Sequence, residues 1–203
     1  MQPVVLKTLN VITYIIMVTT AALHWELLSS IYYDRPNYLR GTQYSMILPG
    51  IVFVLLAGFS IAQWRDSAYD YVMDAIEYNL FASNLVITTW VFTWKLEWLV
   101  VSQILVIINA IFIGRLFMKK QSFTATSLID YIFVHLPFSI YAGLVWVNVF
   151  QSFFSSFTTK EAGPDSWAAI GAAGSIVFML IIANYQAQFS QDPDSWSAIV
   201  IGL

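Results

Sequence analysis

Cysteine is absent from this chain of 203 residues, and charged residues make up only 10% of it. Without cysteine, the chain can form no disulfide, no thiolate-held iron–sulfur cluster and no thiolate zinc site. Soluble domains carry about 25% charged residues, so a chain with so few charges could not cover its surface in water. The net charge of −3 also lacks the basic footprint that binding to nucleic acid or to an anionic membrane surface requires.

Apolar residues take the place of the missing charges. Hydrophobic residues make up 59% of the chain, and the mean hydropathy is +0.70. The aromatic content of 17% suits a bilayer interface, where an apolar ring with a polar edge is favoured. We therefore predict an integral membrane protein, in a membrane that the sequence does not identify. The first apolar run lacks an A-x-A cleavage signal, so we interpret it as a retained span rather than a signal peptide.

Apolar runs long enough to cross a bilayer, about 20 residues each, divide the chain. They predict an all-α polytopic transmembrane bundle with six full helices and a partial seventh, in one domain covering residues 1–203. The predicted spans are residues 11–31, 46–63, 80–94, 98–117, 131–154, 167–185 and, as the partial helix, 195–203. A helix over that last stretch reaches about 14 Å, so either the seventh helix is partial or the natural chain continues past Leu203.

The connections carry further signals. Only KLE separates the third and fourth spans, which predicts a tight antiparallel hairpin at Lys95–Glu97. The stretch RDSAYDYVMDAIEYN after the second span places acidic residues at helical spacing. It predicts either a short amphipathic helix at the interface or an extension of a neighbouring span. The basic residues after the fourth span favour a cytosolic N-terminus.

The stretch SNLVITTWVFTWKLEW, from Ser83 to Trp98, places unusual residues in an apolar run. Trp90, Trp94 and Trp98 recur every four residues, which aligns them on one helix face. Asn84 lies off that face, and an amide in hydrocarbon costs several kcal/mol unless it is paired. Two interpretations stay open. Asn84 is an interhelical hydrogen-bond clamp beside packing tryptophans, or the tryptophans line a pocket for a flat apolar ligand.

The stretch HLPFSIYAGLVWVN in the fifth span is the second unusual one. Pro137 removes a helical hydrogen bond and is expected to kink the helix, while Tyr141, Trp146 and Asn148 supply polar groups. The helix is either a kinked packing helix or one whose freed carbonyl groups face a ligand.

Both stretches resemble a known family. SNLVITTWVFTWK resembles the Ser-Asn-Leu…Trp-Ile-Phe-x-Trp-His segment of the tryptophan-rich sensory protein family, which are relatives of the translocator protein (benzodiazepine-receptor-like membrane proteins). LPFSIYAGLVWVN resembles that family's Pro-Phe-Ser-Ile-Tyr-x-Gly-Trp segment, and DSWSAIVIGL resembles the start of its next-to-last helix. The chain departs from the family pattern at Leu144, where the family has Trp, and at Ala57, Ile87 and Lys95.

The resemblance implies a divergent member whose aromatic-lined interior binds tetrapyrroles, sterols or related lipids. The predicted ligand-binding residues are Asn84, Trp90, Trp94, Pro137, Tyr141, Trp146 and Asn148. The four aromatic residues among them are expected to converge on one slot, which Leu144 widens. The alternative function, of another class, is a non-catalytic structural subunit of a larger membrane protein complex.

Catalytic and metal-binding patterns are not found in the sequence. His24 and His135 are the two histidines, and the helix directions put them at different depths, so we expect no bis-histidine haem. Glu26 is either an intramembrane acid or a group that reaches the interface. We find no phosphate loop, His-x-x-x-His pair or nucleophile elbow, and we expect no enzyme, no metal and no resident cofactor. The expected partners are membrane lipids, a tetrapyrrole or sterol ligand and other subunits, without nucleic acid.

Overall fold

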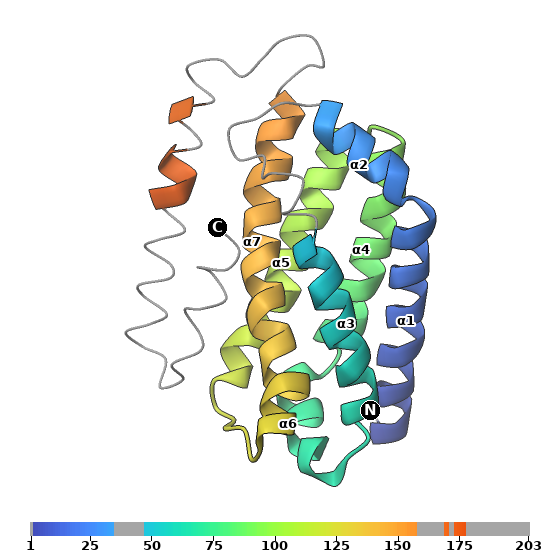
Figure 1. Ribbon diagram of the computed structural model, residues 1–203, viewed down its shortest axis with the longest axis vertical. Coiled ribbons are helices and arrows are strands. Elements are labelled where there is room, and N and C mark those ends of the chain that lie inside the picture. The colour runs from blue at the N-terminus through green and yellow to red at the C-terminus, as the bar shows by residue number, and fades with distance from the viewer. Residues whose placement is uncertain (1, 35–46, 158–168, 171–172, 178–203) are drawn as a thin grey trace.

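The computed structural model describes residues 2–34, 47–157, 169–170 and 173–177, and these form helices joined by short connections, with no strand among them (Figure 1). The long helices are α1 (Pro3–Leu23), α3 (Ile47–Ala62), α4 (Asn79–Lys95), α5 (Leu99–Lys120) and α7 (Leu136–Phe157). The shorter segments are α2 (Trp25–Asp34), η2 (Asp66–Ala68), η3 (Tyr71–Ile76), α6 (Leu128–Asp130) and η4 (Tyr131–His135). The predicted all-α class is confirmed.

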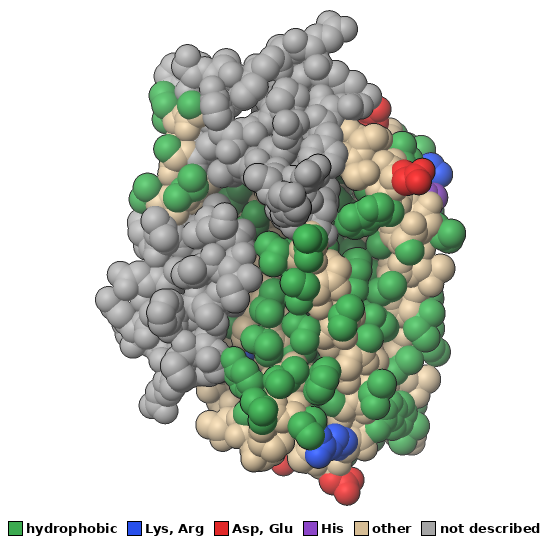
Figure 2. Space-filling model, viewed as in Figure 1, with side chains coloured by type: hydrophobic (Ala, Val, Ile, Leu, Met, Phe, Trp, Pro, Cys, Tyr) green, Lys and Arg blue, Asp and Glu red, His purple; other side chains and the backbone are tan. Residues whose placement is uncertain are grey.

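The bundle has the surface of a membrane protein. Figure 2 shows hydrophobic side chains over the middle of the visible face and charged side chains mainly at its two ends. Three helices, at Pro3–Leu23, Leu99–Lys120 and Leu128–Phe154, are long and apolar enough to span a bilayer, or four if α3 is joined with the segment after it. α4 has 17 residues, at the lower limit of the usual spanning length of about 17–25. These helices show that the chain is an integral membrane protein.

The predicted total of six full helices and a partial seventh is not confirmed. The predicted spans 167–185 and 195–203 lie outside the described residues, apart from helical residues at 169–170 and 173–177.

The predicted limits of the first span are wrong. α1 begins at Pro3, with proline in the first turn, and ends at Leu23, after which His24 adopts φ −114° and ψ 12°. α2 then turns away from the axis of α1 (Figure 1). The helix starts before the apolar run and includes Lys7, because the side chain of Lys7 is buried within the bundle. Its Nζ lies 5.8 Å from the ring centroid of Trp64 and 5.7 Å from that of Tyr69, and cation–π contact offsets part of the cost of burying the charge.

The acidic stretch after α3 crosses the end of the bundle. The chain bends by 111° between Ile47–Ala62 and Asp66–Ile76. In η3, a short π-helix, Tyr71 and Val72 are buried, while Asp74 is exposed. The buried and exposed residues of η3 agree with a short amphipathic helix, while the bend leaves this segment as a second, angled part of the α3 span in the alternative interpretation.

The predicted hairpin between the third and fourth spans is confirmed. The Glu97 N–H donates to the carbonyl of Trp94 at 3.0 Å, and the Trp98 N–H donates to that of Thr93 at 2.9 Å. Glu97 has φ 56°, in the left-handed region that closes many helix ends. The kink expected at Pro137 is not seen as a sharp bend, since Leu128–Phe154 counts as one span. Pro137 lies in the first turn of α7, directly after the π-helix η4.

The core lies between α3, η3, α5 and α7. Phe59 and Phe138 meet at its centre with ring centroids 4.8 Å apart and planes at 82°, an edge-to-face contact that aromatic rings favour. α3 comes very close to η4, because an ideal Cβ on Gly58 would lie 2.2 Å from Cδ1 of Phe133. Only glycine allows this approach without a shift of the ring.

Candidate functional site

Asn84 and its neighbour Ser83 tie α4 to three other helices. Asn84 is fully buried, and its Nδ2 donates to Oγ1 of Thr13 on α1 at 3.2 Å. The Ser83 hydroxyl donates to Oδ1 of Asn109 on α5 at 2.6 Å and lies 3.1 Å from the Tyr141 hydroxyl on α7. The predicted burial and interhelical pairing of Asn84 are confirmed, and this supports its interpretation as a clamp.

The tryptophans of α4 pack on each other rather than on an open cavity. The rings of Trp90 and Trp94 are stacked with centroids 5.5 Å apart and planes at 27°. Trp94 is 3% exposed, whereas Trp98, beyond the helix end, is 57% exposed. Nε1 of Trp90 is buried and has no hydrogen-bond partner. The pair forms one packed unit, and Trp98 does not belong to it.

The predicted residues of the fifth helix are divided between different places. Tyr141 is buried in the polar contact with Ser83, and Pro137 is buried in the first turn of α7. Asn148 is exposed, and Trp146 is half-buried at a groove on the side of α7 that faces α5. The four aromatic residues expected to share one slot do not meet in the groove, since only Trp146 lines it.

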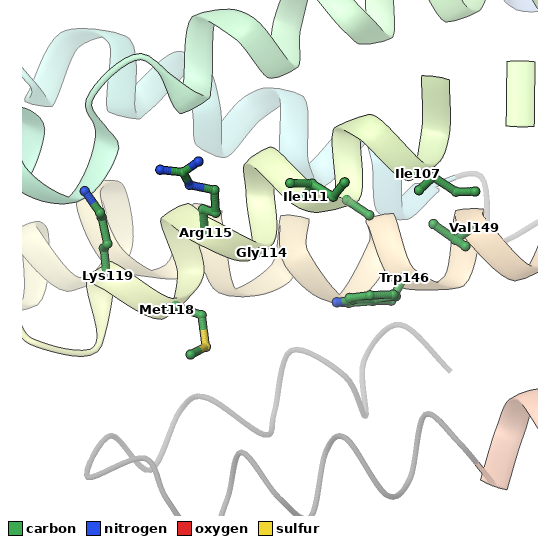
Figure 3. Close-up of a pocket in the computed structure, with 9 residues that line it drawn as sticks. Ile107, Ile111, Gly114, Arg115, Met118, Lys119, Trp146 and Val149 are labelled. Carbon is green, nitrogen blue, oxygen red and sulfur yellow. The ribbon is translucent and has the colours of Figure 1, made fainter. Parts of the chain in front are cut away.

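A groove lies between α5 and α7. It has a volume of about 560 Å³ and is lined by residues from the two helices (Figure 3). The lining residues are Ile107, Ala110, Ile111, Gly114, Arg115, Met118, Lys119, Trp146 and Val149. Its wall is apolar for most of its length, with the indole of Trp146 beside Val149 and opposite the aliphatic residues of α5.

One end of the groove carries positive charge. The guanidinium of Arg115 lies 5.9 Å from the ring centroid of Tyr78, and Nζ of Lys119 forms an ion pair with Glu77 at 2.5 Å. Arg115 is exposed, and its guanidinium points away from Trp146 (Figure 3). The cavity therefore has an apolar, partly aromatic wall and one arginine at its end, while the charge of Lys119 is paired with that of Glu77.

A second polar cluster lies at the start of α7 and was not predicted from the sequence. Lys120 is 1% exposed, and its Nζ donates to the Ser139 hydroxyl and, at 3.4 Å, to the carbonyl of His135. His135 packs on Tyr71 with ring centroids 4.7 Å apart, and its Nε2 lies 3.9 Å from Oδ2 of Asp130. These contacts fasten the end of α5 to η4 and α7.

The two histidines lie at opposite ends of the bundle, as the helix directions predicted (Figure 1). His24 contacts Phe92 edge to face at 5.7 Å between ring centroids. Glu26, in the first turn of α2, is exposed, which agrees with a group that reaches the interface. Across the described ranges, no group of three or more His, Asp or Glu side chains could hold a metal ion.

Several buried polar residues were missed in the sequence. Asn10, Thr13, Gln63 and Asn109 are at most 5% exposed. The signal was present, because each lies in or beside an apolar run, where an unpaired polar group is costly. The same rule that singled out Asn84 applies to the three amides.

Comparison with known proteins gives one match. A family model described as TSPO-like protein matches residues 4–198. No curated protein and no solved structure matches the chain.

Proposed function

The chain belongs to the TSPO-like protein family, and on this premise we propose that it is a non-catalytic membrane protein that binds a flat, mostly apolar ligand of the tetrapyrrole or sterol class. The binding place that we propose is the groove between α5 and α7. The observation that carries the proposal is the groove itself, with Trp146 as part of its wall. Its volume of about 560 Å³ falls within the range of about 300–1,000 Å³ of small-molecule sites.

The chemistry of the groove favours such a ligand. An indole face stacks on a flat apolar body, and the indole N–H can bind a polar edge of the same ligand. Arg115 at the rim suits an acidic substituent, because a guanidinium binds a carboxylate through paired hydrogen bonds. A tetrapyrrole with carboxylate side chains would use both features, whereas a sterol would use only the apolar wall.

Fluorescence titration of the detergent-solubilised protein tests this proposal. A porphyrin dicarboxylate should quench tryptophan fluorescence saturably, and Trp146→Leu should weaken binding about tenfold, or about 1.4 kcal/mol. Trp90→Leu is the matched control, since Trp90 is also half-buried but does not line the groove. If only Trp90→Leu weakened porphyrin binding, the ligand would bind at α4 and not in the groove. Linear quenching that is equal in all variants would mean partition into detergent and would contradict the proposal.

Filling the groove gives an independent test. A Cβ on Gly114 would meet nothing within 4 Å, so Gly114→Leu should insert a side chain into the cavity and abolish binding without disturbing the helix. Gly50 also has open space at its Cβ and lies in α3, so Gly50→Leu serves as the control and should bind normally. Arg115→Gln should weaken binding of the porphyrin dicarboxylate and leave binding of a sterol unchanged.

A further inference from the structure

The contact between α1, α3 and α4 carries an inference separate from the groove. Asn10, Gln63 and Asn84 are amide side chains that are at most 1% exposed, and Thr13 beside them is 5% exposed. Each takes part in hydrogen bonds between or along these helices. These hydrogen bonds determine whether the nitrogen or the oxygen of each amide is bonded, and which of the two atoms has no partner.

The orientation of Asn10 follows from Gln63. Nε2 of Gln63 donates to the backbone carbonyls of Lys7 and Ser60, both at 3.2 Å. Because a carbonyl can only accept, Gln63 must present its amide nitrogen to them and its Oε1 to Asn10. Asn10 therefore presents its own nitrogen, and its Nδ2 donates to Oε1 of Gln63 at 3.3 Å.

The orientation of Asn84 follows in the same way from Thr13. The Thr13 hydroxyl donates its single proton to the backbone carbonyl of Leu9 at 2.8 Å. Its oxygen is then only an acceptor towards α4, so Asn84 must present Nδ2, at 3.2 Å. An exchange of oxygen and nitrogen in either asparagine would break the chain of bonds.

Two hydrogen-bond acceptors remain without a donor. Oδ1 of Asn10 and Oδ1 of Asn84 are both buried and have no partner. Asn10 and Thr13 are three residues apart on α1, which makes them neighbours on one helix face. Since Asn84 is bonded to Thr13, both amides belong to the same small region. Buried carbonyl oxygens without a partner are uncommon because their desolvation is not compensated.

We propose that this region is a binding site for a neutral hydrogen-bond donor, held between the amide oxygens of Asn10 and Asn84. The donor is either a water molecule, which has two protons for two acceptors, or the hydroxyl group of a membrane lipid. A cation fits less well, because the positive charge of Lys7 lies one turn away on α1 and the side chains that form these hydrogen bonds are all uncharged.

A double-mutant cycle tests whether the two asparagines share one donor. Asn10→Leu, Asn84→Leu and the double variant are compared in vesicles of synthetic phosphatidylcholine, which contain no hydroxylated lipid. No direct bond joins the two side chains, but Thr13 contacts both residues, because its hydroxyl accepts from Asn84 and lies 3.3 Å from the Asn10 backbone carbonyl. The cycle is therefore measured in a Thr13→Val background, where this link is removed and remaining coupling indicates a bridging group. We expect the unfolding equilibrium constant of the double variant to differ at least about threefold from the product of the single effects.

Asn79 supplies the matched control. It is also fully buried on α4 and also has an unpaired Oδ1, but its Nδ2 donates to the carbonyl of Ile76. It lies five residues from Asn84 and so on another side of the helix. Asn10→Leu and Asn79→Leu should therefore be additive. Coupling in vesicles of pure phosphatidylcholine assigns the donor as water, and coupling that appears only after a sterol is added assigns it as a lipid hydroxyl.

Nuclear magnetic resonance on the wild-type protein covers the case in which a variant fails to fold. Cross-relaxation should appear between the side-chain amide protons of Asn84 and either water or the sterol hydroxyl. Additive mutations in both membranes would overturn the proposal. A wild-type spectrum in which neither asparagine shows a cross peak to a donor proton would also overturn it.

Discussion

The Ser83 hydroxyl lies 3.1 Å from the Tyr141 hydroxyl, and this contact joins the two stretches of sequence that resemble the tryptophan-rich sensory protein family. Ser83 begins the first stretch, on α4, and Tyr141 lies in the middle of the second, on α7. Asn109 of α5 accepts a bond from the same serine. The two motifs therefore meet at a buried polar contact among three helices rather than at an open cavity.

This contact predicts a stability effect. Tyr141→Phe removes the phenol hydroxyl but keeps the ring and the bond between Ser83 and Asn109. We expect a loss of about 0.6 kcal/mol, the average for hydrogen bonds between membrane helices. Ser83→Ala should cost more, because it removes the contacts of this hydroxyl with both Asn109 and Tyr141. Unfolding in mixed micelles measures both, and Tyr141→Phe should add almost nothing in a Ser83→Ala background.

The clamp between Asn84 and Thr13 gives the second prediction. Asn84→Leu should lower the free energy of unfolding by about 0.5–2 kcal/mol, since it removes an interhelical bond from a buried site. The neighbouring Leu85 is 45% exposed, so Leu85→Ala is a suitable control and should change stability little. Identical melting of Asn84→Leu and the wild-type protein would show that the interhelical bond contributes nothing.

The close approach of α3 and η4 gives the third prediction. Gly58→Ala places a methyl group 2.2 Å from Cδ1 of Phe133, which is far inside van der Waals contact. Overpacking of this kind costs about 1–3 kcal/mol. Gly50→Ala meets nothing within 4 Å and should be neutral or slightly stabilising. Phe133→Leu should recover part of the loss in Gly58→Ala. If both glycine variants melt alike, the helices are not in close contact at Gly58.

The sequence predicted that Asn84 would be paired, but not its partner. A lone amide in an apolar run has to find a partner, and this holds whatever the arrangement of the helices. Thr13 gives no such signal, because a threonine in a helix can bond its own backbone, as it does here to Leu9. The choice of partner depends on how α1 and α4 are rotated against each other, which composition does not determine.

The start of α1 and most of the residues that line the groove also depend on packing between helices, so they were not predictable from the sequence. The early start of α1 requires Lys7 to lie near the rings of Trp64 and Tyr69, which are distant in sequence. Trp146 was predicted as a ligand-binding residue and does line the groove. Its neighbours Ile107 and Ile111 are aliphatic residues that sequence alone cannot distinguish from lipid-facing ones.

The path of the chain through the membrane gives the last prediction, and the absence of native cysteine makes it straightforward to test. Gln2, Leu96 and Thr124 are all exposed and lie outside the long helices. Because α4 and α5 form a hairpin, Leu96 lies at one end of the bundle, while Gln2 and Thr124 lie at the other (Figure 1). A membrane-impermeant maleimide should label Gln2→Cys and Thr124→Cys from one side and Leu96→Cys from the opposite side. With the cytosolic N-terminus that the basic residues favour, only Leu96→Cys should react when the reagent is kept from the cytosolic face of the membrane. Labelling of Leu96→Cys and Thr124→Cys from the same side would mean that α5 does not span the bilayer.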